Sequence, residues 1–316
     1  MGLIVKGQWV DKWYDTKASN GKFVRQDSRF RSVISNDENN EFQPEAGRYH
    51  LYVSLACPWA HRTLIFRKLK QLEDVISVSV VNAEMMENGW EFGEHGDPLY
   101  GLDYAYQLYL KADANYEGRV TVPILWDKKT ETIVNNESIE IIRMFNSAFN
   151  ELTGNSHDYY PIELRDEIEQ VNDRVYHTIN NGVYKAGFAT TQEAYGDAYY
   201  ALFDSLDWLE DLLSKQRYLA GEQLTEADWR LFTTLVRFDA VYHGHFKCNR
   251  NKLTEFHHIS NYVRELYQVE GVKETVDLDY SKIHYYVSHT SINPTQVVPL
   301  GPEHTFEAAH DRDRAY

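Results

Sequence analysis

YHLYVSLACPWAHRTLIFRKLK, residues 49–70, is the most informative segment of this chain. Apolar and polar residues alternate over 50–56, which predicts a buried strand there. Pro58 suits the first helical position, because its missing N–H would be unpaired there in any case. Apolar residues then recur at helical spacing, which predicts a helix that keeps its basic residues in water. These basic residues are Arg62, Arg67, Lys68 and Lys70.

Cys57 lies where this strand gives way to the helix. A thiol at a helix N-terminus faces unpaired N–H groups and the positive end of the dipole, and both favour the nucleophilic thiolate. The pattern therefore predicts a reactive cysteine, against the alternative of a small buried apolar residue. Ala60 stands where a C-x-x-C motif needs its second cysteine. An outside thiol would then have to resolve a mixed disulfide on Cys57, which indicates a thiol cosubstrate.

The composition is that of a soluble globular protein, with 43% hydrophobic and 25% charged residues. A length of 316 residues favours two domains. The net charge of −16 argues against a nucleic-acid or anionic-membrane partner, since both need a basic surface. No apolar run is long enough to span a membrane, and the N-terminus lacks a signal-peptide pattern. With only two cysteines, the chain suits a reducing compartment, and we expect it in the cytoplasm.

Further strands follow the Cys57 segment. Residues 75–81 predict a second buried strand, and strand–helix–strand implies a parallel pair with a right-handed crossover. Residues 120–127 predict a third strand, in which Pro123 marks an edge or a special bend. A cis Val122–Pro123 bond would present the backbone of Val122 to a ligand, whereas a trans proline would mark only a sheet edge. Residues 132–134 complete a hairpin with the third strand.

A helix is predicted over 139–149, with Ser138 as its cap. The N–H groups at such a helix start form an anion site suited to a carboxylate, although Glu137 and Ser138 would also serve for capping alone. The order βαβ, β-hairpin, α, with a proline opposite the cysteine, predicts an α/β thioredoxin-like domain.

The rest of the chain divides into regions of different character. We expect a largely irregular N-terminal arm at 1–47, the thioredoxin-like domain at 48–150, and an all-helical domain at 151–316 with a less regular tail after Asp279. Residues 82–118 form an insertion long enough to be functional. Helices are expected at 162–181, at 192–216, after a capping box that begins at Thr225, and at 253–266.

Six motifs carry a more specific similarity. They are CPWAHR (57–62), RVTVPILWD (119–127), NNESIEIIRMF (135–145), NNGVYKAGFA (180–189), YHGHFKCNR (242–250) and HYYVSH (284–289). With them, nearly the whole chain resembles the glutathionyl-hydroquinone reductases, also called Xi-class glutathione transferases. The resemblance implies the glutathione-transferase architecture, a thioredoxin-like half followed by an all-α half.

The resemblance also implies a reaction. Such enzymes remove glutathione from S-glutathionyl-hydroquinones: the cysteine, here Cys57, attacks the glutathione sulfur and expels the hydroquinone. A second glutathione then releases oxidised glutathione from the mixed disulfide. Glutathione would be a cosubstrate, and no bound cofactor is expected.

Site residues follow from the same motifs. The implied glutathione-binding residues are Trp90, Arg119, Val122, Glu137 and Ser138. The Val122 backbone would pair with the cysteinyl backbone of glutathione, Glu137 would hold the γ-glutamyl ammonium, and Ser138 the γ-glutamyl carboxylate. Arg119 would be a second carboxylate partner.

Tyrosines of the helical motifs line the hydroquinone site in this family. They correspond to Tyr184, Tyr242 and Tyr285, with Tyr286 as the alternative to the last. Their hydroxyls would bond the quinol oxygens and assist proton transfer.

Other reactive side chains allow more than one interpretation. His243, His245 and Cys248 have a metal-like spacing, but a closed zinc site needs about four ligands, and we expect no metal. Cys248 is a less favoured resolving thiol than glutathione. His61 would either support the Cys57 thiolate or lie on the helix surface.

Two other functions stay open at this level. One is a broader glutathione-dependent thiol transferase or dehydroascorbate reductase. The other is a non-enzymatic binding scaffold, since fold does not determine function. The family resemblance further implies a homodimer.

Overall fold

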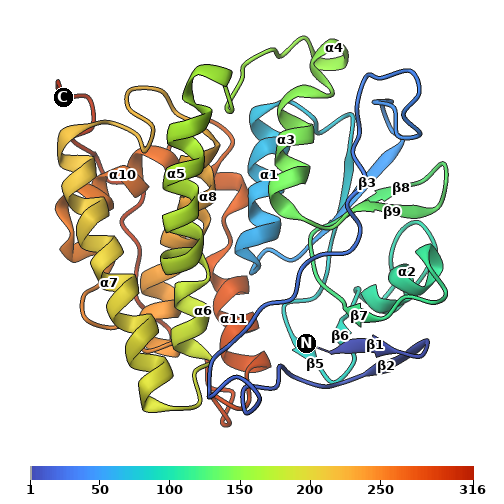
Figure 1. Ribbon diagram of the computed structural model, residues 1–316, viewed down its shortest axis with the longest axis horizontal. Coiled ribbons are helices and arrows are strands. Elements are labelled where there is room, and N and C mark those ends of the chain that lie inside the picture. The colour runs from blue at the N-terminus through green and yellow to red at the C-terminus, as the bar shows by residue number, and fades with distance from the viewer. Residues whose placement is uncertain (1) are drawn as a thin grey trace. The chain divides into compact units, whose positions relative to one another are not determined.

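The computed structural model describes residues 2–316, which divide into two compact units (Figure 1). Unit 1 contains the chain up to Trp13, Gln26–His157 and Thr275–Ser288. Unit 2 contains Tyr14–Arg25, Asp158–Glu274 and His289–Tyr316. The arm and the C-terminal region thus each contribute to both units, which chain order alone does not indicate.

Unit 1 is built on a four-stranded sheet with the order β4-β3-β8-β9. The parallel pair is β3 (Tyr49–Val53) and β4 (Ser77–Val80), joined by helix α1 (Pro58–Leu69). Strand β8 (Ile124–Asp127) pairs antiparallel with β3 and with β9 (Thr132–Asn135). Helix α1 packs against α3 (Ser138–Ser147), beside the sheet in Figure 1. This arrangement confirms the predicted thioredoxin-like half.

The sheet corrects two predictions about its strands. Residues 75–81 are not a buried strand, because β4 lies at the sheet edge and Val80 is 41% exposed. Pro123 precedes β8 instead of lying within it, and β8 is a central strand. The Val122–Pro123 bond is cis, as one of the two alternatives predicted. Because proline has no N–H to donate, the strand starts only after it.

The basic residues of α1 do not all point to water, as the helical pattern predicted. Arg62 and Lys70 are 2% and 1% exposed. The Nζ of Lys70 donates to the carbonyl of His157 at 2.5 Å, and Arg67 donates from Nε to the carbonyl of Ile76 at 2.7 Å. Lysine and arginine can bury their aliphatic carbons in this way when the charged group at the end of the side chain has a hydrogen-bond acceptor.

The N-terminal arm is more regular than predicted. Its first residues form a hairpin of β1 (Leu3–Val5) and β2 (Gln8–Val10), and β1 also pairs with β7 (Gly118–Arg119). Lys6 and Gly7 both have positive φ, as a tight two-residue hairpin turn requires.

The insertion at 82–118 also contains regular structure. It holds the short hairpin of β5 (Met85–Met86) and β6 (Gly89–Trp90), followed by helix α2 (Ala105–Ala112). A short helix, α4 (Asn150–Thr153), follows α3.

Unit 2 is helical. Its longer helices are α5 (Arg165–Val175), α6 (Gly182–Gly187), α7 (Gln192–Lys215), α8 (Glu226–Arg237) and α10 (His257–Tyr267). Single-turn helices precede or extend them at Ile162–Leu164, Tyr176–Asn180, Phe238–Tyr242, α9 (His243–His245), Leu253–Glu255 and Lys273–Thr275. These elements confirm the predicted all-α half. No helix within 2–316 is both long and apolar enough to cross a membrane.

The predicted capping box opens α8. The backbone N–H of Thr225 donates to the Asp228 carboxylate at 2.9 Å, and every residue of α8 is buried. The expected helix over 162–181 is in fact divided, because a π-helical turn, Tyr176–Asn180, follows α5.

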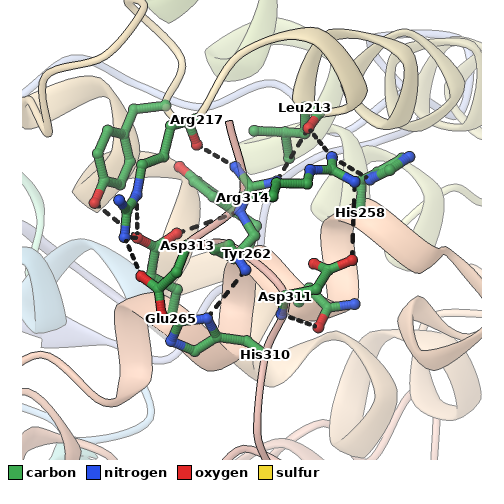
Figure 2. Close-up of polar contacts among 12 residues, drawn as sticks. Leu213, Arg217, His258, Tyr262, Glu265, His310, Asp311, Asp313 and Arg314 are labelled. Carbon is green, nitrogen blue, oxygen red and sulfur yellow. Dashed lines mark hydrogen bonds and ion pairs between the residues drawn. The ribbon is translucent and has the colours of Figure 1, made fainter. Parts of the chain in front are cut away.

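The start of the C-terminal region is more regular than predicted, since a less regular tail was expected after Asp279. Residues Leu278–Ser288 form helix α11, which belongs to unit 1. Beyond it, polar contacts hold residues 310–314 against α10 and the end of α7, as Figure 2 shows. Asp311 pairs with His257 at 2.7 Å, and the guanidinium of Arg312, fully buried, donates to the carbonyl of Leu213 at 3.0 Å.

Candidate active site

Cys57 is the N-cap of α1. Its backbone is extended, and its sulfur accepts a hydrogen bond from the backbone N–H of Ala60 at 3.5 Å. The side chain is partly exposed, and the residue is a thiol without a disulfide. The thiol therefore lies at the positive end of a helix dipole, in the setting that favours thiolate and nucleophilic attack.

The cis peptide bond lies beside this sulfur. The Cys57 Sγ is 3.5 Å from the carbonyl oxygen of Val122, although the two residues are far apart in sequence. Pairing of β3 with β8 brings them together, since Cys57 follows β3 and Val122 precedes β8. The backbone of Val122 is thus next to the position that a sulfur bound to Cys57 would occupy.

The start of α3 forms the second part of the site. Glu137, not Ser138, is the N-cap, and its carboxylate accepts from the N–H of Ile139 at 3.4 Å. The predicted cap is wrong because Ser138 already has its place in the first helical turn. Its hydroxyl oxygen instead accepts from Nη1 of Arg62 at 3.3 Å. A buried guanidinium and a helix N-terminus together make this position suited to a carboxylate.

Arg62 was not among the predicted site residues. Helical periodicity placed it in water, but the packing of α1 against α3 brings it to Ser138 and over the ring of Trp59, 4.6 Å from its centroid. The only sequence signal for it was its place in the motif that contains Cys57.

Trp90 and Arg119 lie on short strands of unit 1. The indole of Trp90 is 4% exposed and stacks on the ring of His284, with centroids 5.0 Å apart. Its Nε1 is buried without an acceptor among residues 2–316. Arg119 donates from Nη1 to the carbonyl of Lys12, so its guanidinium contacts the N-terminal arm.

Two of the three predicted substrate tyrosines meet in unit 2. The rings of Tyr184 on α6 and Tyr242 have centroids 6.1 Å apart, and both contact the ring of Phe246. Tyr242 is fully buried, whereas Tyr184 is partly exposed. Tyr285 belongs to α11 in unit 1, where it is 2% exposed, and the neighbouring Tyr286 is less buried.

The remaining reactive side chains can now be interpreted. Cys248 is fully buried, and burial raises the pKa of its thiol, which is unfavourable for a resolving nucleophile. Within residues 2–316, His, Cys, Asp and Glu form no group of three or more that could hold a metal ion. His61 is not on the helix surface: it is fully buried, and its Nε2 lies 2.7 Å from the hydroxyl of Thr275.

Comparison with known proteins agrees with this geometry. Residues 56–148 match the family model of the glutathione S-transferase N-terminal domain, and residues 192–265 match that of the C-terminal domain. These two domains in this order define a glutathione transferase. The chain belongs to that family, and within it to the Xi class, the glutathionyl-hydroquinone reductases.

Similar curated proteins share more than half of their residues with this chain. Glutathionyl-hydroquinone reductase PcpF of Sphingobium chlorophenolicum is 56% identical over 96% of this chain and 96% of its own. Glutathionyl-hydroquinone reductase YqjG of Escherichia coli K12 is 54% identical over 99% of both chains. Among solved structures, the Xi-class glutathione transferase of Natrialba magadii has a TM-score of 0.92 at 48% identity, covering 99% of this chain and 97% of its own. Glutathione-bound YqjG has a TM-score of 0.88 at 53% identity, covering 90% and 96%.

Proposed function

We propose that this chain is a glutathionyl-hydroquinone reductase in which Cys57 is the catalytic residue. The observation that carries the proposal is the position of Cys57, at the N-terminus of α1 and 3.5 Å from the carbonyl of the cis Val122–Pro123 bond. Relatives more than 50% identical over nearly the full chain are named for this activity.

In the first half of the reaction, the Cys57 thiolate attacks the sulfur of an S-glutathionyl-hydroquinone. A disulfide forms between Cys57 and glutathione while the bond from sulfur to the aromatic ring breaks. The electron pair of that bond stays with the ring carbon, which takes up a proton and leaves as the hydroquinone.

In the second half, the thiolate of another glutathione attacks the mixed disulfide. Oxidised glutathione leaves, and the Cys57 thiolate is restored. Position 60 offers no internal resolving thiol, because it is Ala60, and Cys248 is buried with a raised pKa. Glutathione is therefore both the group removed and the reductant.

The glutathione moiety would lie along the thioredoxin-like half. The Val122 backbone pairs with the cysteinyl residue, and Glu137 holds the γ-glutamyl ammonium. The γ-glutamyl carboxylate takes the position at Ser138, where the α3 N-terminus and Arg62 supply positive charge. Trp90 and Arg119 contact the remainder of the tripeptide, as their family positions suggest.

The hydroquinone ring would be held by Tyr184, Tyr242 and Tyr285. Their hydroxyl groups donate to the quinol oxygens and assist protonation of the departing ring. The aromatic cluster of Tyr184, Tyr242 and Phe246 supports this proposal for the first two, because packed aromatic side chains suit a flat aromatic substrate.

The test is the glutathione-dependent release of hydroquinone from a synthetic S-glutathionyl-hydroquinone. The wild-type chain is expected to turn it over, and intact-mass measurement is expected to show one glutathione added in disulfide linkage. The variant Cys57→Ser should do neither, because an alcohol cannot form the disulfide. Turnover retained in Cys57→Ser would contradict the mechanism.

The same assay separates the other functions. A general thiol transferase would reduce small mixed disulfides or dehydroascorbate with a kcat/KM at least equal to that for the glutathionyl conjugate. A binding scaffold would show neither activity, and its cysteine would alkylate with the pH dependence of a free thiol.

We further infer a cytoplasmic homodimer. Both cysteines are thiols, as a reducing compartment favours, and the family resemblance suggests the dimer. Small-angle scattering decides the second point, since a mass near 37.0 kDa would mean a monomer.

A further inference from the structure

Residues at the start of helix α11 contact the segment that precedes Cys57. The hydroxyl of Tyr280 donates to the carbonyl of Val81 at 2.5 Å and lies 3.4 Å from the hydroxyl of Ser54. The next residue, Ser281, donates its hydroxyl proton to the carbonyl of Asp277 at 2.7 Å, and its Oγ lies 3.5 Å from the carbonyl of Leu55. All of these residues lie in unit 1, and α11 lies beyond both regions that match the transferase family models.

Residues 54–57 form the turn between β3 and α1. The N–H of Cys57 donates to the carbonyl of Ser54 at 3.2 Å, and the N–H of Ala56 donates to the Ser54 hydroxyl at 3.2 Å. Since the proton of Tyr280 goes to Val81, the Ser54 hydroxyl donates to the Tyr280 oxygen. One chain of hydrogen bonds thus runs from the Cys57 turn through Tyr280 to the end of β4.

The hydroxyl of Tyr280 also lies within the electrostatic influence of the thiol. Burial raises the pKa of Tyr280 to about 12, and the charge of a Cys57 thiolate adds to this rise. The phenol therefore stays protonated at neutral pH and keeps its donor bond to Val81. A neutral tyrosine can influence the thiol by holding neighbouring backbone in place through hydrogen bonds, and not through a charge of its own.

We propose that Tyr280 is a positioning residue, which holds the 54–57 turn so that the Cys57 sulfur stays at the N-terminus of α1. The Ala60 N–H donates to this sulfur at 3.5 Å, an ordinary length for a hydrogen bond to sulfur, and a shift of the turn would lengthen and weaken it. Helix α11 thereby belongs to the thiol site. The inference rests on the proposed catalytic role of Cys57.

The test is the rate of Cys57 alkylation by iodoacetamide as a function of pH, measured by mass spectrometry of the peptide that contains it. In Tyr280→Phe the half-maximal rate is expected about half a pH unit higher than in the wild type, because the thiolate loses part of its stabilisation by the helix. Tyr280 itself titrates near pH 12, so the substitution removes no charge in the range of the assay. In steady-state turnover, kcat should fall while KM for the conjugate stays the same.

Tyr49→Phe is the matched control. Tyr49 is equally part of unit 1, fully buried, and its hydroxyl donates to the carbonyl of Gln43 at 2.6 Å, at the opposite end of β3 from Cys57. Both variants should unfold at a lower urea concentration than the wild type, but only Tyr280→Phe should shift the alkylation profile. Equal profiles for Tyr280→Phe and Tyr49→Phe would overturn the proposal.

Ser54→Ala perturbs the same contact from its other side, because it removes the hydroxyl that lies 3.4 Å from that of Tyr280. It should shift the alkylation profile in the same direction, and it decides the matter if Tyr280→Phe does not fold. An unchanged profile in Ser54→Ala would then count against the role of α11. The alkylation assay needs no substrate, so it tests the role of Tyr280 whether or not the chain turns over hydroquinone conjugates. Absence of hydroquinone turnover in the wild type would refute the proposed function and leave the alkylation result unaffected.

Discussion

Replacing Glu137 by glutamine tests the glutathione site with little change to the fold. Glu137 caps α3 by accepting from the N–H of Ile139 at 3.4 Å, and it also accepts from the hydroxyl of Ser28 at 3.3 Å. The amide oxygen of a glutamine can still accept from the Ile139 N–H. Its NH2 group can donate to the Ser28 hydroxyl, which has a second acceptor in the carbonyl of Asn136 at 3.2 Å. Glu137→Gln therefore removes the negative charge while the helix cap can be kept.

The magnitude follows from the charge that is lost. The ammonium stays charged in the variant, so it keeps a hydrogen bond to the amide oxygen and loses only its ion pair with the carboxylate. An ion pair near the protein surface contributes up to about 1 kcal/mol, which corresponds to about a fivefold weaker affinity for glutathione. The free energy of unfolding should fall by no more than about 0.5 kcal/mol, since the half-buried cap still has an acceptor.

The assay is isothermal titration of glutathione into the Cys57→Ser background, which prevents disulfide chemistry. Glu140→Gln is the matched control, because it removes the same charge one turn along α3. The Glu140 carboxylate is already paired with Arg31, whose Nε donates at 2.7 Å, and this hydrogen bond from Arg31 lowers the pKa of Glu140. Glu140→Gln should therefore lower stability without weakening glutathione binding.

Equal weakening of binding by both glutamine variants would contradict a direct contact of Glu137 with glutathione, because the effect would then report general electrostatics. Unchanged glutathione binding by Glu137→Gln would contradict it as well. In steady state the same substitution should raise KM for glutathione and leave kcat nearly unchanged, as expected for an interaction made equally in ground and transition states.

Three further predictions concern the thiol and the stability of each unit. Cys57→Ser should lower kcat below detection in the hydroquinone assay while keeping the melting temperature within a few degrees, as differential scanning calorimetry can check. Arg48→Leu should cost about 3–5 kcal/mol of unfolding free energy in urea titration, because it leaves the fully buried carboxylate of Asp127, 2.6 Å from Arg48, without its counter-ion. Burial raises the pKa of Asp228 to about 6 in the folded protein, so the folded state holds this proton more tightly than the unfolded state does. The stability that this proton contributes is full below the unfolded pKa near 4 and is lost as pH rises through 6. Between pH 4 and 7 the wild type should thus lose about 3 kcal/mol more than Asp228→Asn, and parallel stability curves for the two would contradict this assignment.

Much of the thiol site was predictable because its signals are local. The strand–Cys–Pro–helix order around Cys57, the cis alternative at Val122–Pro123 and the acidic start of α3 each depend on a few consecutive residues. Proline geometry, helix capping and dipole position act over one turn, so a short segment contains the information. The capping box at Thr225 was predictable for the same reason.

Several of the errors concern contacts between segments distant in sequence. Helical periodicity placed Arg62 in water, yet the packing of α1 against α3 buries it beside Ser138. The buried strand predicted at 75–81 is an edge strand, since periodicity shows which side chains are apolar and not how strands are ordered in the sheet.

Residues 49–70 alone therefore predicted a reactive thiol with single-cysteine chemistry, and the segments that follow, up to residue 149, predicted the thioredoxin-like half around it. Tertiary structure alone placed the carbonyl of Val122 against the Cys57 sulfur and brought Tyr280, from the far C-terminal part of the chain, to the turn before it. The physical reason is the range of the interactions. Helix propensity and capping are encoded by neighbouring residues, whereas these contacts exist only after strand pairing and helix packing bring remote segments together.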